Sequence, residues 1–315
     1  MVKLILRVIC MDKKHLLLKE IRDARDSGLY SIASVDMFSI VDELDIYDNI
    51  YLHMEYVDEL LKDYLGEIES LDSNKDGIYE FLKAIRVGDV VDNQNLENKN
   101  SFLIGLYSKI TRETAMGKLI KYANSGKQLV GDDIFDIHHT LLARTSSSGI
   151  ESIRKDNDKF VGRIVDGKPE FDYFPMDYSD IMIAASKLVN LYNNRLEQDG
   201  FDNVYLQPFL IHGLLGGLQI FSDGNTRMGR IMQHALIWQL INEKMDFNFE
   251  MPPLYATRSY YPVRFQYRDK IAKLVNDGSN ETWNDWFDFN LDRIEDSISA
   301  DTENIKVLKR KNKYK

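Results

Sequence analysis

A short stretch of the sequence, residues 219–230, gathers amide, acidic and basic side chains in the order QIFSDGNTRMGR. Its centre, Asp-Gly-Asn at 223–225, is a turn-forming sequence between two helical patterns, the second of which begins near Thr226. The backbone N–H groups in the first turn of a helix have no partner inside that helix, so they can bind an anion. The stretch therefore predicts an anion-binding site at the start of the second helix.

Two arginines and one aspartate could extend this site. Arg227 and Arg230 are three residues apart and share a helix face, where their guanidinium groups could bind further phosphate oxygens. Asp223, at the mouth of the loop, offers hard oxygen ligands that could hold Mg²⁺ through the same phosphates. These residues favour a nucleotide–metal complex as the ligand. The alternative is a simple helix connector followed by two arginines in ion pairs, which is the usual situation of such residues.

Taken together, these residues resemble the signature of the Fic domain family, His-x-Phe-x-Asp/Glu-Gly-Asn-Gly-Arg-x-x-Arg. The family transfers nucleotide monophosphates, such as AMP from ATP, onto Ser, Thr or Tyr hydroxyls of target proteins. The resemblance implies ATP or another nucleotide with Mg²⁺ as cofactor and Asp223 as the metal ligand. Six of the eight fixed positions agree, namely Phe221, Asp223, Gly224, Asn225, Arg227 and Arg230. The implied phosphate-binding residues are Gly224, Asn225, Thr226, Arg227 and Arg230.

Two positions depart from this signature. Gln219 occupies the place of the histidine that takes the proton from the target hydroxyl. A carboxamide has no basic site near neutral pH, so the general-base contribution, roughly 10²–10⁴ in rate, should be lost. Thr226 replaces a glycine; its branched Cβ could crowd the anion, whereas its hydroxyl could donate a hydrogen bond to it.

Two other histidines could act near the motif. His212 lies seven residues before Gln219, about 10 Å along a helix, which is too far to replace the missing base. His234 lies four residues after Arg230 on the same helix face and could approach the phosphates, although an ordinary helical histidine is the simpler interpretation.

We therefore expect a Fic-type protein that keeps a nucleotide-binding loop and whose adenylyl transfer is absent or strongly weakened. Two alternatives stay open. In one, the chain is an active transferase of AMP or another phosphate-containing group, with Gln219 orienting the target hydroxyl. In the other, it is a non-enzymatic interaction scaffold, in which the turn is structural and the arginines are paired inside the protein.

Helices are expected to position this stretch. The six prolines and eighteen glycines are few for 315 residues, and the abundant Leu, Ile, Lys and Asp favour a mainly α fold. Helical spacing is clear in residues 46–65, 132–142, 181–196 and 204–221. The last of these segments is unusually apolar and carries three glycines, which predicts a buried central helix. The resemblance implies a Fic-type helical bundle with a small β-hairpin flap.

Residues 160–174 contain the expected β element. Two short β-prone runs surround Asp166-Gly167, which is a typical two-residue hairpin turn. The resemblance implies that this hairpin is the flap on which a target protein docks. The candidate docking residues are Phe160, Val161, Gly162, Arg163, Phe171 and Tyr173.

The length suggests two unequal modules. We expect an additional N-terminal region at 1–100, mostly helical and without an assigned role, a Fic-like domain at 101–300, and a basic tail at 301–315. The first boundary is placed after residues 89–100, a polar segment with four asparagines.

Composition limits the partners and the compartment. The net charge of −10 argues against nucleic-acid binding over a broad surface, because such binding needs a net basic face. Cys10 is the only cysteine, which excludes an internal disulfide and fits a reducing compartment. No apolar run reaches the roughly 18 residues of a membrane span. These features predict a cytoplasmic protein, and the resemblance implies a nucleotide and a target protein as its partners; its oligomeric state is left open.

Overall fold

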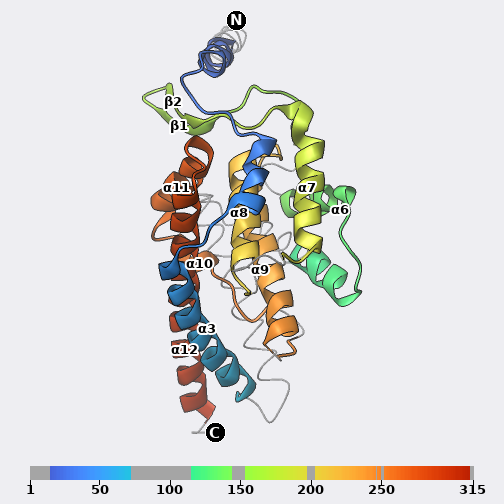
Figure 1. Cartoon of the computed structure of the whole chain (residues 1–315), viewed down its shortest axis with the longest axis vertical. Coiled ribbons are helices and arrows are strands. Elements are labelled where there is room, and N and C mark those ends of the chain that lie inside the picture. The colour runs from blue at the N-terminus through green and yellow to red at the C-terminus, as the bar shows by residue number, and fades with distance from the viewer. Residues whose placement is uncertain are drawn as a thin grey trace, which may run out of the picture.

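The computed structural model describes residues 15–71, 115–143, 153–196, 203–245, 247–249 and 252–312. Within these residues helices dominate, and the single sheet is a two-stranded antiparallel hairpin (Figure 1). This arrangement confirms the expected mainly α fold with a small hairpin. The boundary expected after residues 89–100 lies outside the described residues.

A few short elements precede the long helices of the bundle. Helical residues 15–26 come first among the described residues, and they are followed by η1 (Val35–Ser39), α2 (Ile40–Glu43) and α3 (Asp48–Glu69). After helical residues 115–124 come α6 (Gly131–Leu142), β1 (Val161–Val165), β2 (Lys168–Tyr173), η2 (Tyr178–Asp180), α7 (Ile181–Asn193), α8 (Leu206–Leu218), α9 (Asn225–Lys244), α10 (Thr257–Tyr260), α11 (Arg264–Asn276) and α12 (Asn280–Asn312).

Helix α8 forms the centre of the molecule, as its apolar sequence predicts. Every residue of α8 is buried, and α9 packs along it (Figure 1). Two of its glycines permit close neighbours. A Cβ at Gly213 would lie 2.9 Å from the side chains of both Trp283 and Trp286, and one at Gly216 would lie 2.9 Å from Ile271. The small residues therefore allow α11 and α12 to approach the backbone of α8.

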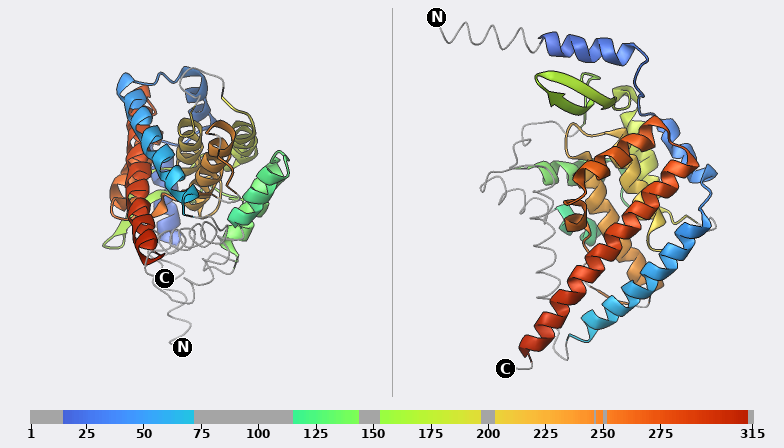
Figure 2. Two further views of the ribbon diagram at one scale, coloured as in Figure 1. Left: turned by 90° about the horizontal axis from the view of Figure 1, so that it is seen from below. Right: turned by 90° about the vertical axis from the view of Figure 1, so that its left-hand side faces the viewer.

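Helices α3 and α12 lie side by side although they are far apart in the sequence (Figure 1, Figure 2). The start of α3 is held by two amide side chains of α12, since Asn280 accepts from the Asp45 N–H and Asn284 from the Tyr47 N–H, each at 2.9 Å. The apolar face of α3 joins the same hydrophobic core as the central helix. Residues 33–71 therefore share one core with the C-terminal helix.

The hairpin has the turn that its sequence predicts. Asp166 and Gly167 have φ angles of 51° and 80°, the positive values that a two-residue hairpin turn requires. A bulge lies between Val161 and Gly162. Only glycine fits at that bulge, because a Cβ on Gly162 would lie 2.0 Å from the carbonyl oxygen of Glu170.

The base of the hairpin is tied to the N-terminal segment. The Phe174 N–H donates to the Ser31 carbonyl at 2.8 Å, and the Ala33 N–H donates to the Phe174 carbonyl at 2.9 Å. The helix of residues 15–26, which precedes this segment, lies next to the hairpin (Figure 2), and its Arg22 pairs at 2.5 Å with Asp158, three residues before β1. Among the helices described here, none is both long enough and apolar enough to cross a membrane.

Candidate functional site

The chain makes a sharp turn between α8 and α9. Gln219 follows the last residue of α8 in the left-handed conformation, with φ 54° and ψ 51°, and Gly224 precedes α9 with φ 76°. A left-handed backbone costs a residue other than glycine roughly 1–2 kcal/mol. The six-residue loop 219–224 is therefore held in shape by contacts around it. We refer to this loop together with the first two residues of α9, residues 219–226, as the motif loop.

The side chain of Gln219 is fixed at both ends of its amide. Its Nε2 donates to the carbonyl of Gly216 at 2.6 Å, and its Oε1 accepts from Asn225 Nδ2 at 3.0 Å. Asn225 is buried and also bridges the loop, because its Oδ1 accepts from the Phe221 N–H at 2.8 Å. The two amides therefore form one network that joins the end of α8 to the start of α9.

Tyr173, the last residue of β2, contacts the same carbonyl. Its hydroxyl donates to Gly216 O at 2.9 Å, and burial raises the pKa of this phenol far above its usual value. Gly216 lies in the last turn of α8, whose carbonyls lack helical partners. The carbonyl of Gly216 accepts hydrogen bonds from both Tyr173 and Gln219, and this shared acceptor anchors the hairpin to the motif loop.

His138, on α6, supports the motif loop from within the protein. Its Nε2 donates to the Asp223 carbonyl at 2.6 Å, and its ring stacks on Phe221 with centroids 3.8 Å apart. Burial lowers the pKa of His138 to about 4, so the imidazole is neutral near pH 7. The sequence shows His138 only as part of an apolar helix pattern, and its role depends on a contact 85 residues away.

Two basic residues before the hairpin also reach the loop region. Lys159 is half-buried, and its ammonium donates to the carbonyl of Ser222; burial lowers the pKa of this amine. Arg154 is 2% exposed and donates to the carbonyl of Asp156 at 2.6 Å and to that of Met176. No sequence motif marks these two residues, and only the fold places them beside residues 219–226.

A cavity of about 700 Å³ lies between the hairpin, the motif loop and α11. Its charged lining is mixed, with Arg154, Lys159, Arg163 and Arg268 as cations and Asp172, Asp223 and Asp269 as acids. It brings together many of the residues that the sequence predicts for the site. These are Gln219, Asp223, Gly224, Asn225 and Thr226 from the loop, with Phe160, Val161, Gly162, Arg163 and Tyr173 from the hairpin.

Phe171, the remaining docking candidate, has other neighbours. Its ring packs against those of Tyr30, Phe160 and Phe174, with centroids 5.2, 5.0 and 5.4 Å away. Phe171 therefore helps to hold the hairpin on the N-terminal segment.

The two arginines of the motif do not line this cavity. Arg227 is 3% exposed, and its Nη2 lies 3.2 Å from Asp223 Oδ2. Arg230 is fully buried; its Nη1 donates to the Tyr267 hydroxyl at 3.2 Å, and its guanidinium lies over the Tyr267 ring. In this structure both arginines are therefore engaged inside the protein.

The histidines of α8 and α9 are also in the core. His212 Nδ1 contacts Gln233 Oε1 and its Nε2 contacts the Tyr267 hydroxyl at 2.8 Å; burial holds its pKa well below the usual value. His234 Nε2 accepts from the Ala256 N–H at 3.1 Å. Both histidines form structural hydrogen bonds.

Part of the sequence, and the fold, are similar to those of known proteins. Residues 128–237 match the model of the Fic/DOC family. The crystal structure of a Fic family protein from Desulfovibrio desulfuricans G20 has a similar fold, with a TM-score of 0.57 and 14% identity over 82% of this chain and 76% of that chain. A structure of Fic-1 from C. elegans gives a TM-score of 0.45 and 14% identity over 96% and 75% of the two chains. The comparison with curated proteins found no match.

Proposed function

This chain carries a Fic/DOC family domain at residues 128–237, and we propose that it binds a nucleotide in the cavity described above while its adenylyl transfer is absent or strongly weakened. The observation that carries this proposal is the state of Gln219. The residue lines the cavity at the general-base position of the motif, and both ends of its amide are hydrogen-bonded to the protein.

The chemistry of the amide explains the expected loss of transfer. A carboxamide cannot accept the proton of a target hydroxyl near neutral pH. The neighbouring imidazole of His138 donates to the Asp223 carbonyl and is fixed in the core, so it is not placed to act instead. Without a base, the reaction would retain only the contributions of binding and orientation, and would lose roughly 10²–10⁴ in rate.

The cavity supplies suitable groups for a nucleotide. Its volume of about 700 Å³ falls within the usual range for small-molecule sites, roughly 300–1,000 Å³. Gly224, Asn225 and Thr226 line it at the N-terminus of α9, where backbone N–H groups and the helix dipole favour phosphate. The ammonium of Lys159 adds a positive charge beside Ser222.

Asp223 fits the metal that the family implies. Its carboxylate lines the cavity and is 37% exposed, which suits a Mg²⁺ ion held by one carboxylate together with phosphate oxygens. Mg²⁺ would neutralise phosphate charge in the bound nucleotide. Asp223 would share its carboxylate between this ion and Arg227, which lies 3.2 Å from Oδ2.

Label transfer tests the proposal directly. The protein and its Gln219→His variant are incubated with labelled ATP and Mg²⁺, and label on protein is followed by gel and mass spectrometry. We expect ATP to bind both proteins in a parallel titration and label to appear only with the variant. Label on the unchanged protein would contradict the proposed impairment. Absence of ATP binding up to millimolar concentration would contradict the proposed nucleotide site.

A second candidate function follows from the two arginines. Arg227 contacts Asp223 and Arg230 contacts Tyr267, which are the internal contacts expected of a scaffold that binds a partner protein without a nucleotide. Under this function, the Arg227→Ala change would lower stability but change no ligand affinity. Thermal unfolding with and without ATP distinguishes the two functions, because only a nucleotide-binding protein is stabilised by ATP.

A further inference from the structure

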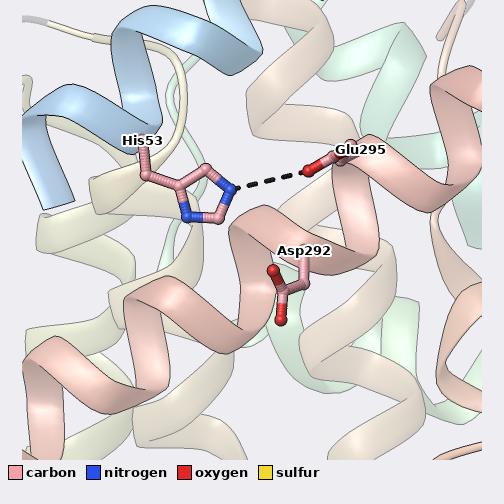
Figure 3. A group of neighbouring side chains, drawn as sticks. All are labelled: His53, Asp292 and Glu295. Carbon is pink, nitrogen blue, oxygen red and sulfur yellow. Dashed lines mark ion pairs between the residues drawn. The ribbon is translucent and has the colours of Figure 1, made fainter. Parts of the chain in front are cut away.

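Polar side chains meet at the surface between α3 and α12, in a region that the cavity does not include. His53 extends from α3 toward Asp292 and Glu295 of α12 (Figure 3). Asp288 lies one turn before Asp292, so the three carboxylates occupy neighbouring turns on one face of α12. The helices that form the core thus carry one imidazole and three carboxylates at a shared edge.

The distances within this group suit a shared cation. One ligand atom from each of His53, Asp292 and Glu295 lies within 4.8 Å of the other two. His53 Nε2 is 3.8 Å from Glu295 Oε2. Ligand atoms around a tetrahedral zinc ion, with bonds of about 2.0–2.2 Å, lie roughly 3.4 Å apart. Small side-chain rotations would therefore bring all three atoms to zinc.

The orientation of His53 is set by Asp288. His53 Nδ1 lies 2.7 Å from Asp288 Oδ1, and because a carboxylate accepts, Nδ1 carries the hydrogen in the neutral ring. The lone pair is then on Nε2, the nitrogen nearest Glu295 (Figure 3). A carboxylate that orients a histidine ligand in this way is the usual partner of histidine in zinc sites.

The local charge also favours a cation. Asp288, Asp292 and Glu295 supply three negative charges. The nearby Arg293 lies closer to Asp296, at 3.1 Å, than to Asp292, at 3.8 Å. The side chains of His53 and Glu295 are 18% and 35% exposed, so an ion can enter from solvent and keep a water ligand.

From these observations we propose that His53, Asp292 and Glu295 bind one zinc ion, with Asp288 as the orienting partner of His53. The imidazole nitrogen selects zinc over Mg²⁺ and Ca²⁺, which prefer all-oxygen sites. The ion links α3 to α12 and so acts as a structural clip. This site stands independently of the nucleotide proposal, since residues of α3 and α12 do not line the cavity.

Zinc titration of the full chain tests the clip. Protein freed of metal with a chelator is titrated with ZnCl₂ by calorimetry, and thermal unfolding is followed at each zinc concentration. We expect one zinc ion per chain and a Tm that rises with zinc concentration. Asp288→Asn removes the orienting partner of His53 and should weaken zinc affinity by roughly 10–100-fold. His53→Gln and Glu295→Gln remove ligands and should weaken it by at least as much.

A control variant, a check of helix content and a competition with Mg²⁺ accompany the zinc titration. His139, on α6, is exposed and outside the cluster, so His139→Gln should bind zinc like the unchanged protein. Circular dichroism of each variant checks that the helices remain. Excess Mg²⁺ should not displace the zinc. If no zinc binds, or if His53→Gln binds it unchanged, the three residues form only an ion-pair cluster and the proposal is wrong.

Discussion

The imidazole of His138 lies almost parallel to the ring of Phe221, at an interplanar angle of 4°, while its Nε2 donates to the carbonyl of Asp223. One side chain from α6 thus contacts the motif loop at two points. The shape of the loop therefore depends on a helix far from it in the sequence.

Lowering the pH should reveal the burial of His138. Its pKa is about 4 in the folded protein and near 6.5 in the unfolded chain. Below about pH 6.5 the unfolded chain binds a proton that the folded protein does not, so folding stability decreases as the pH falls toward 4. The loss from this residue between pH 7 and pH 5 should be about 2 kcal/mol. Urea unfolding at both pH values measures it.

The His138→Gln variant supplies the control for this effect. Glutamine does not titrate in this range, so the variant should lose about 2 kcal/mol less than the unchanged protein between the two pH values. Equal losses would mean that His138 makes no contribution. At pH 7 the variant should be less stable, because the stacking on Phe221 is lost.

Removing the amine of Lys159 should weaken nucleotide binding, if the proposed function holds. The ammonium contacts the loop carbonyl of Ser222 and lines the cavity, whereas the motif arginines do not line it. A hydrogen bond to a charged group contributes roughly 1.5–3 kcal/mol, so Lys159→Ala should lower ATP affinity about 10–100-fold. Lys155→Ala is the control, since Lys155 is exposed and does not line the cavity. Equal affinities of the two variants would exclude a role for Lys159.

A methyl group added to α8 should destabilise the protein. The Cβ of a Gly213→Ala variant would lie 2.9 Å from two tryptophan side chains, and Trp286 is held by its hydrogen bond to Phe209 O at 2.9 Å. Overpacking of this kind costs about 1–3 kcal/mol, which exceeds the helix-propensity gain of about 1 kcal/mol. Gly66→Ala on α3 meets nothing within 4 Å and should stabilise the helix by up to about 1 kcal/mol. Thermal unfolding of both variants gives the comparison, and equal shifts would contradict the close packing around α8.

Tyr173 and Gln219 should show coupled effects on stability. Both donate to the carbonyl of Gly216, so Tyr173→Phe leaves this acceptor one partner and should cost about 1 kcal/mol. Gln219→Ala alone should cost a similar amount. The double variant leaves the buried carbonyl without either donor, so its cost should exceed the sum of the single costs. Strictly additive values from urea unfolding would show that the two bonds are independent.

Local signals in the sequence were sufficient for several elements. Asp166-Gly167 marked the hairpin because that turn needs residues that tolerate positive φ. The apolar run of α8 predicted burial because it has no polar face to expose. The turn before Asn225 was predicted from the local sequence Asp-Gly-Asn, and the structure places it between α8 and α9.

Other features depended on contacts that no local pattern records. The spacing of Arg227 and Arg230 placed them on one helix face, but the direction of that face is set by packing, here toward Asp223 and Tyr267. His138 and Lys159 reach the loop from segments 85 and 63 residues away. These contacts follow from tertiary structure, so the sequence could supply the motif residues but not their neighbours.

The pairing of α3 with α12 also has a consequence for synthesis of the chain. Helix α3 ends at Glu69, whereas α12 begins at Asn280, 211 residues later. At roughly 5–20 residues per second, the ribosome needs about 10–40 s to make the intervening segment. During that interval the apolar residues of α3 have no α12 to cover them, so the nascent chain offers a binding surface to chaperones until α12 emerges.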